Sequence, residues 1–207
     1  MPDCSARSRG CSAPVPDRVT APGPDARARL LALLRARSVL RGDFVLASGR
    51  RSPYYVDCRR TTMHADGLAL VGALGLAAIR AAGWDPRLVG GLTLGADPVA
   101  YAIALASVST ATPIHAFTVR KQAKAHGARN RIEGCFEPGA RVVVVEDVIT
   151  TGASALEAAT VVREAGGLVA GVLAVVDREE GGREVLERAG SPVRALCRLQ
   201  ELLATTD

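Results

Sequence analysis

The chain has 207 residues, of which 48% are hydrophobic and 23% charged, with a formal net charge of +5. This length suits a single domain whose core needs neither disulfides nor structural metals. No apolar run approaches the roughly 18 residues of a membrane-spanning helix, and the five cysteines form no Cys-x-x-Cys pair, which argues against a membrane protein, a zinc site and a redox motif.

The N-terminal segment 1–24 is rich in Pro, Ser, Ala and Arg and has no apolar stretch. It is therefore expected to be a disordered extension and not a secretory signal. An organellar transit peptide is a weaker alternative, because Asp3, Asp17 and many prolines oppose it. Residues 25–207 are predicted to form one domain, and reduced cysteines in a cytoplasmic protein are the default expectation.

The first half of the domain alternates between helical and strand-like patterns. Leu30, Leu33 and Leu34 share one stripe of the first helix, with Asp25 as a candidate cap and Gly42 as its end. The expected elements are a helix over 25–40, two short strands within 43–57, a helix over 65–82, a strand over 87–92, a helix over 97–106 and a strand over 113–119.

The second half opens with a polar segment, 120–134, long enough to be a mobile loop. The elements expected after it are a strand over 141–146, a helix over 154–165, a strand over 168–176, a helix over 185–188 and a strand over 193–196. Such alternation predicts an α/β fold with a mostly parallel sheet flanked by helices. Ligands of these sheets bind at the carboxyl ends of the strands.

The segment 142–155, VVVVEDVITTGASA, carries the clearest chemical signal. Four valines predict a strand buried on both faces. Glu146 and Asp147 follow, where they can hold sugar hydroxyls or a metal ion. The turn 150–154 lies where a helix begins, and a helix N-terminus attracts phosphate. A phosphate site beside two carboxylates suggests a ribose 5-phosphate.

This motif resembles the 5-phosphoribosyl 1-diphosphate (PRPP) binding motif of the type I phosphoribosyltransferases. The alternative is an ordinary strand-to-helix turn with chance acidic residues. The chain contains neither a Walker A loop nor a Gly-x-Gly-x-x-Gly dinucleotide fingerprint. The resemblance implies that family's fold, with a small N-terminal hood at about 43–60.

A second motif lies in the polar segment and reads Arg120-Lys121-x-x-Lys124-x-His126-Gly127. Taken alone it would be a charged loop in solvent. Beside the first motif it resembles the mobile catalytic loop of the orotate phosphoribosyltransferases, at about 120–134. Cations at this spacing suit a loop that closes over a diphosphate.

Three further segments match the same family. SGRRSPYYVD at 48–57 resembles the hood that covers the base, although Ala47 stands where many members carry lysine. GGLTLGADP at 90–98 resembles the loop that receives diphosphate, or is simply a glycine-rich turn. Arg178, after the strand 168–176, corresponds to the arginine that meets the orotate carboxylate.

The resemblance therefore implies an enzyme that transfers ribose 5-phosphate from PRPP to N1 of orotate, giving orotidine 5′-monophosphate and diphosphate in pyrimidine biosynthesis. Mg²⁺ is expected to arrive with PRPP and to have no direct protein ligand. A homodimer that shares the mobile loop between subunits is also implied. No specific nucleic-acid binding is expected, because aromatic stacking residues and RNA-binding motifs are missing.

The resemblance also implies residue roles. Lys124, Lys121 and Asp147 are the expected catalytic residues, and Thr150 and Arg178 the orotate-binding residues. The expected PRPP-binding residues are Arg120, Lys121, Lys124, His126, Glu146, Asp147, Val148, Ile149, Thr150, Thr151, Gly152, Ala153 and Ser154. Two alternatives remain at this point: a phosphoribosyltransferase for another base, and a PRPP-sensing regulator without catalysis.

Overall fold

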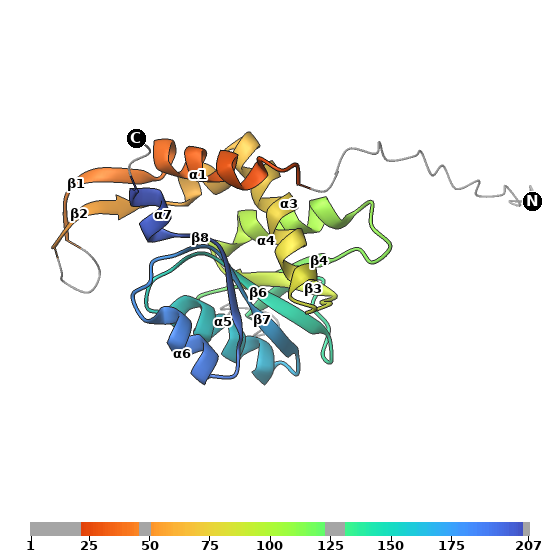
Figure 1. Ribbon diagram of the computed structural model, residues 1–207. Coiled ribbons are helices and arrows are strands. Elements are labelled where there is room, and N and C mark those ends of the chain that lie inside the picture. Colours follow the sequence, from red (N-terminus) through yellow and green to blue (C-terminus); the bar gives the residue numbers. More distant parts are fainter. Residues whose placement is uncertain (1–21, 46–50, 123–130, 205–207) are drawn as a thin grey trace, which may run out of the picture.

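The computed structural model describes residues 22–45, 51–122 and 131–204 (Figure 1). Helices and strands alternate along these ranges, as the sequence predicts. In chain order the elements are α1 (Ala26–Arg37), β1 (Val39–Val45), β2 (Arg51–Val56), α2 (Arg59–Thr62), α3 (Ala65–Ala81), β3 (Leu88–Leu92), α4 (Ala96–Ser107), β4 (His115–Val119), β5 (Ile132–Gly134), β6 (Arg141–Ile149), α5 (Ala153–Glu164), β7 (Leu168–Asp177), α6 (Gly182–Arg188), β8 (Val193–Arg198) and α7 (Leu199–Leu203).

The main sheet has the strand order β5-β4-β3-β6-β7-β8. All neighbouring strands in it are parallel except β4 and β5, which pair antiparallel. The prediction of a mostly parallel sheet is therefore confirmed. Strand β6 lies near the middle, and its four consecutive valines, 142–145, are fully buried because helices cover both faces.

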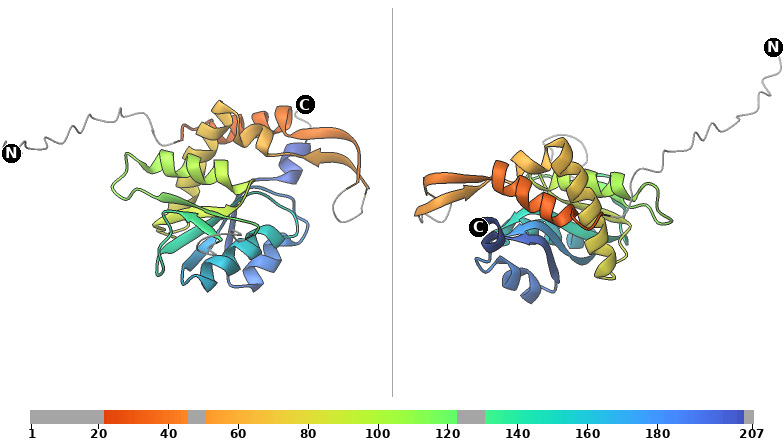
Figure 2. Two further views of the ribbon diagram at one scale, coloured as in Figure 1. Left: turned by 180° about the vertical axis from the view of Figure 1, so that it is seen from behind. Right: turned by 45° about the horizontal axis from the view of Figure 1, so that its top comes forward.

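The two faces of β6 belong to two different apolar clusters, because successive side chains of a strand point to opposite sides. Val143 and Val145 pack in the cluster that includes α1, α3 and α4. Val142 and Val144 pack in the cluster that includes α5 and α6. The views in Figures 1 and 2 show α3 and α4 on one face of the sheet and α5 and α6 on the other.

The strands β1 and β2 form a separate antiparallel hairpin. It extends from the body of the molecule beside α7, which directly follows the carboxyl end of β8 (Figures 1 and 2). The hairpin therefore lies toward the carboxyl edge of the main sheet. This is the location expected of a hood over a site built there.

The first helix is shorter than predicted. It ends at Arg37, because Val39 and Leu40 pair with Val56 and Tyr55 in the hairpin. Gly42 consequently lies inside β1 and does not end the helix, so that prediction was wrong. Asp25 occupies the N-cap position but makes no side-chain capping hydrogen bond.

Two other elements differ from the prediction. Strand β6 continues through the acidic pair to Ile149, because its pairing with β7 continues as far as Ile149 and Asp177. The segment predicted as a loop over 120–134 ends in strand β5, which pairs with β4. The short helices α2 and α7 were not predicted. Within the described ranges, no helix combines the length and apolarity needed to cross a membrane.

Candidate functional site

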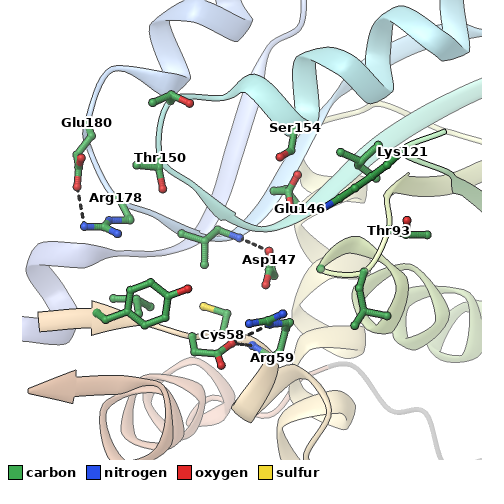
Figure 3. A pocket seen from close by; sticks show the side chains of 18 of the residues that line it. Cys58, Arg59, Thr93, Lys121, Glu146, Asp147, Thr150, Ser154, Arg178 and Glu180 are labelled. Carbon is green, nitrogen blue, oxygen red and sulfur yellow. Dashed lines mark hydrogen bonds and ion pairs between the residues drawn. The ribbon is translucent and has the colours of Figure 1, made fainter. Parts of the chain in front are cut away.

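A cleft of about 780 Å³ opens at the carboxyl ends of β3, β6 and β7 (Figure 3). Segments that are far apart in the sequence meet in it, as expected for a parallel sheet. The lining residues are Tyr55, Val56, Asp57, Cys58 and Arg59 from the end of the hairpin, Leu92, Thr93, Leu94 and Gly95 after β3, Lys121 after β4, Glu146, Asp147, Val148, Thr150, Thr151 and Ser154 from β6 and the turn after it, and Arg178, Glu179 and Glu180 after β7.

The acidic pair lies at the centre of the cleft (Figure 3). Glu146 is only 7% exposed, and its Oε2 atom is buried without a hydrogen-bond partner among the described residues. Asp147 is half-buried, and its Oδ1 atom accepts a hydrogen bond of 2.9 Å from the N–H of Val148. An unpaired buried acceptor is costly in a folded protein, so it indicates that a donor from a ligand belongs there.

The electrostatics of the pair follow from burial. Desolvation raises the pKa of Glu146 well above its ordinary value, and the neighbouring charge of Asp147 raises it further. Lys121, which Figure 3 shows pointing toward Glu146, acts in the opposite direction. A cationic or hydroxyl-bearing ligand would stabilise the ionised form of this carboxyl.

The turn after β6 is fixed by contacts between glycine backbones. Gly152 has a φ of +80°, and a Cβ atom there would lie 2.8 Å from the carbonyl oxygen of Gly182. Helix α5 begins at Ala153, so its first N–H groups face the turn. A second cavity of about 100 Å³ lies at this helix start, lined by Glu146 and residues 148–155. Its position at a helix N-terminus suits a phosphate group.

The turn after β3 approaches the acidic pair closely. A Cβ atom on Gly95 would lie 2.5 Å from Oδ1 of Asp147, and one on Gly91 would lie 2.2 Å from the carbonyl oxygen of Val145. A side chain at Gly91 would collide with backbone, and one at Gly95 would displace the Asp147 carboxylate. The peptide bond between Thr93 and Leu94 is cis. The sequence 90–98 therefore does more than turn the chain, because its glycines allow backbone to line the cleft.

Arg178 lies at the opposite end of the cleft from Lys121 (Figure 3). Its side chain is 6% exposed and forms an ion pair of 2.8 Å with Glu180. Its Nε atom is buried and has no hydrogen-bond partner within the described part of the chain. The backbone N–H of Arg178 donates to the carbonyl oxygen of Ile149, so β6 and β7 hold Arg178 beside Thr150.

Most of the predicted site residues that the structure describes lie at the two cavities. Lys121, Glu146, Asp147, Val148, Thr150, Thr151, Ser154 and Arg178 line the cleft, and Ile149, Gly152 and Ala153 line the smaller cavity. Arg120 lines neither and forms an ion pair of 3.1 Å with Glu133. Lys124 and His126 lie outside the described residues, as does Ala47.

Sequence reasoning placed Cys58 and Arg59 in the hood segment at about 43–60 but did not single them out as site residues, although both line the cleft. The Cys58 thiol is buried, and burial followed by the charge of Asp147 raises its pKa well above the ordinary value. It is therefore a neutral packing residue. Arg59 is charged and reaches into the cleft (Figure 3). In the described ranges, no group of three or more His, Cys, Asp or Glu side chains is placed to hold a metal ion.

The comparisons with known proteins agree with one another. The chain is 48% identical over 180 residues to orotate phosphoribosyltransferase of Aquifex aeolicus (strain VF5), covering 86% of the chain and 97% of that protein. A crystal structure of Mycobacterium tuberculosis H37Rv orotate phosphoribosyltransferase matches with a TM-score of 0.77 and 49% identity, over 86% of the chain and 99% of the other. A crystal structure of the same enzyme in complex with PRPP matches with a TM-score of 0.73 and 46% identity, over 86% of the chain and 98% of the other. No family model matches the chain.

Proposed function

The chain belongs to the orotate phosphoribosyltransferases, a family of pentosyltransferases with the type I phosphoribosyltransferase fold, and from this membership we propose how its cleft transfers ribose 5-phosphate from PRPP to N1 of orotate. One observation carries the proposal. The acidic pair with the helix start after it, Lys121, and Arg178 come from three separate segments and meet around one cavity. Each has the chemistry that one part of the two substrates requires.

The 5-phosphate of PRPP binds at the start of α5. Backbone N–H groups of 151–154 donate to its oxygens, and the helix dipole adds a partial positive charge. The contact between Gly152 and Gly182 holds this turn in place before the substrate arrives. A site that is already formed loses less entropy on binding.

The ribose lies along the end of β6, where Glu146 and Asp147 accept hydrogen bonds from its 2- and 3-hydroxyls. The unpaired Oε2 atom of Glu146 supports this assignment. The same carboxylates stabilise the positive charge that develops on the sugar as its bond to diphosphate lengthens. Mg²⁺ would arrive with PRPP and have no direct protein ligand, and it would supply positive charge for the departing diphosphate.

Orotate lies between the hood and the end of β7. Arg178 binds the orotate carboxylate, since a guanidinium and a carboxylate match in geometry and charge. Its unpaired Nε atom supports the assignment. Thr150 donates to or accepts from the pyrimidine ring. Residues 54 and 55 of the hairpin cover the base, with Tyr55 lining the cleft.

Lys121, Lys124, Arg120 and His126 neutralise the diphosphate as it leaves, with Lys124 contributing most. Loop closure excludes water, which would otherwise hydrolyse PRPP. If the loop serves the neighbouring subunit, a mixed dimer of Lys124→Ala and Arg178→Ala subunits should recover activity at one of its two sites. A steady-state assay compares the activity of the mixture with that of each variant alone. If the mixture is no more active than the variants alone, the subunits do not share the loop.

The active form is a homodimer in the cytoplasm. Three exposed apolar residues support the dimer. Tyr101 and Leu105 on α4 and Val108 at its C-cap form a stripe with exposed fractions of 54%, 66% and 44%. Tyr101 bonds to Thr118 on β4, the strand that leads to Lys121. The stripe therefore lies near the start of the catalytic loop. Free thiols at Cys58, Cys135 and Cys197 within the described residues suit a reducing compartment.

The first test follows orotate absorbance after protein, PRPP, Mg²⁺ and orotate are mixed, with uracil, hypoxanthine and adenine in parallel. Turnover of orotate alone is the expected result. Turnover of another base would support the PRPP site but contradict the role of Arg178 as the orotate-binding residue. Absence of turnover with every base, together with PRPP binding in a calorimeter, would favour a PRPP-sensing regulator.

A further inference from the structure

Arg59 is the cation of the cleft that the assignments above leave without a role. It begins α2, directly after the hood hairpin, and its side chain lines the cleft. Figure 3 shows its guanidinium extending toward Asp147 from the opposite wall. The last two residues of α2, Thr61 and Thr62, are fully buried, so the helix that carries Arg59 is anchored in the molecule.

The Arg59 guanidinium is bound to Asp57 through one edge, and its other edge is available to a ligand. Its Nε atom donates to Oδ1 of Asp57 at 2.9 Å, and the backbone N–H of Arg59 donates to the same atom at 3.3 Å. Asp57 is itself tied to the body of the molecule by a backbone hydrogen bond to Ser38. In the described part of the chain this is the only side-chain hydrogen bond that Arg59 makes, so its two terminal nitrogens remain as donors.

The charge of the cleft calls for such a cation. Its described lining contains the carboxyls of Asp57, Glu146, Asp147, Glu179 and Glu180 but only three basic side chains, Arg59, Lys121 and Arg178. Arg178 is paired with Glu180 and Arg59 with Asp57, but the pair with Asp57 uses only the Nε atom of Arg59. Lys121 faces the ionisable Glu146 (Figure 3). A diphosphate entering this cleft needs additional positive charge, and the terminal nitrogens of Arg59 can supply it.

We propose that Arg59 binds the diphosphate of PRPP through its two terminal nitrogens and holds the leaving group above the ribose. The proposal rests on the proposed function, because it takes PRPP as the substrate. If Asp147 holds the ribose hydroxyls, Arg59 on the opposite wall faces the other substituents of the sugar ring. The diphosphate is the anionic substituent there, since the orotate carboxylate is taken by Arg178 at the far end of the cleft (Figure 3).

The shape of the Arg59 side chain also suits a diphosphate. Its planar, two-pronged guanidinium binds phosphate oxygens in a fixed orientation, which an ammonium group does not.

The test compares Arg59→Gln with Arg60→Gln. Both changes remove one charge from α2, but Arg60 does not line the cleft. For Arg59→Gln we expect the KM for PRPP and the dissociation constants of PRPP and diphosphate to rise about 10- to 100-fold, the usual effect of losing a charge-assisted hydrogen bond. The KM for orotate should change by less than about threefold, since Arg178 binds that substrate. Arg59→Lys should recover part of the loss, and Arg60→Gln should behave as the wild type.

The outcomes separate this inference from the proposed function. A wild-type protein that fails to convert orotate contradicts the function, and calorimetry with PRPP and diphosphate then still tests Arg59. Equal PRPP and diphosphate affinities for Arg59→Gln and Arg60→Gln would overturn the inference. A rise confined to the KM for orotate would also overturn the inference. Thermal melting of each variant checks that it is folded. If Arg59→Gln does not fold, Arg59→Lys is compared with Arg60→Gln instead.

Discussion

Glu146 shows how a functional side chain can oppose stability. It is almost fully buried, one oxygen has no partner, and its neighbour Asp147 carries the same charge. Its raised pKa means that the folded protein disfavours the ionised form. The folded state therefore loses stability as the pH rises from the ordinary glutamate pKa, about 4.3, toward the raised native value. Below that range the carboxyl is protonated in both states and the effect disappears.

We therefore expect Glu146→Gln to be more stable than the wild type at pH 8 and equally stable near pH 4. The gain should appear as a higher Tm at pH 8 and an unchanged Tm near pH 4. Thermal melts at both pH values measure it. The same variant should lose about tenfold or more in kcat/KM for PRPP. A lower Tm at pH 8 would show that the carboxylate is paired in the free protein.

At the residue scale, the sequence identified the chemistry better than the contacts. Glu146 and Asp147 could be chosen because they follow a run of four valines that predicts a buried strand. Thr150 and Arg178 could be chosen because the chain resembles the orotate phosphoribosyltransferases at those positions. Arg59 could not be chosen in this way. Its place in the cleft depends on α2, a single helical turn without a periodic pattern, and on how the hairpin folds over the sheet.

Among the elements, β6 was the easiest to predict and the easiest to underestimate. Four consecutive valines marked it as a buried strand. The acidic pair that follows was expected to end it, yet pairing with β7 carries the strand on to Ile149. Local sequence cannot show that extension, because the hydrogen bonds come from a partner more than 20 residues away. The same limit applies to β1, where cross-strand pairing takes Val39 and Leu40 from the predicted helix.

The turn after β3 gives a prediction at this scale. In Gly95→Ala the new Cβ atom would lie 2.5 Å from Oδ1 of Asp147, so the carboxylate must move. We expect kcat/KM for PRPP to fall about 10- to 100-fold, because small displacements of positioning groups are costly to catalysis. Steady-state kinetics measure the loss.

The matched control is Gly23→Ala, since nothing lies within 4 Å of a Cβ atom at Gly23. It should leave the kinetics unchanged. Both variants should melt within a few degrees of the wild type, because Asp147 is half-buried at an open cleft and can rotate. Unchanged kinetics in Gly95→Ala would show that the approach of this turn to Asp147 has no role in turnover.

At the scale of the whole molecule, the fold class followed from the alternation of helices and strands, but the surface did not. The stripe of Tyr101, Leu105 and Val108 lies on a helix whose sequence is apolar on nearly every side. Sequence alone could not tell which residues of α4 cover the sheet and which remain exposed. Only the packing of α4 against α3 and β3 separates them.

The proposed dimer is tested on this stripe. Leu105→Glu should yield a monomer in light scattering and lose most activity, because a charge at a buried apolar interface is expensive to desolvate. Leu168→Glu is the matched control, since Leu168 is similarly exposed, at 58%, but starts β7 away from α4. It should keep the wild-type mass and turnover. A dimeric Leu105→Glu would place the subunit contact elsewhere.

The continuous pairing of β6 with β7 has one further consequence. The ladder continues to Ile149 and Asp177, and the next residues, Thr150 and Arg178, extend from adjacent strands. Adjacent strands are ~4.8 Å apart, so the backbone sets a fixed separation between Thr150, which meets the pyrimidine ring, and Arg178, which meets the orotate carboxylate. The sheet therefore fixes the length of orotate that the site accepts. An orotate analogue with one methylene between ring and carboxylate should fit poorly, whatever its charge, because the backbone cannot lengthen to receive it.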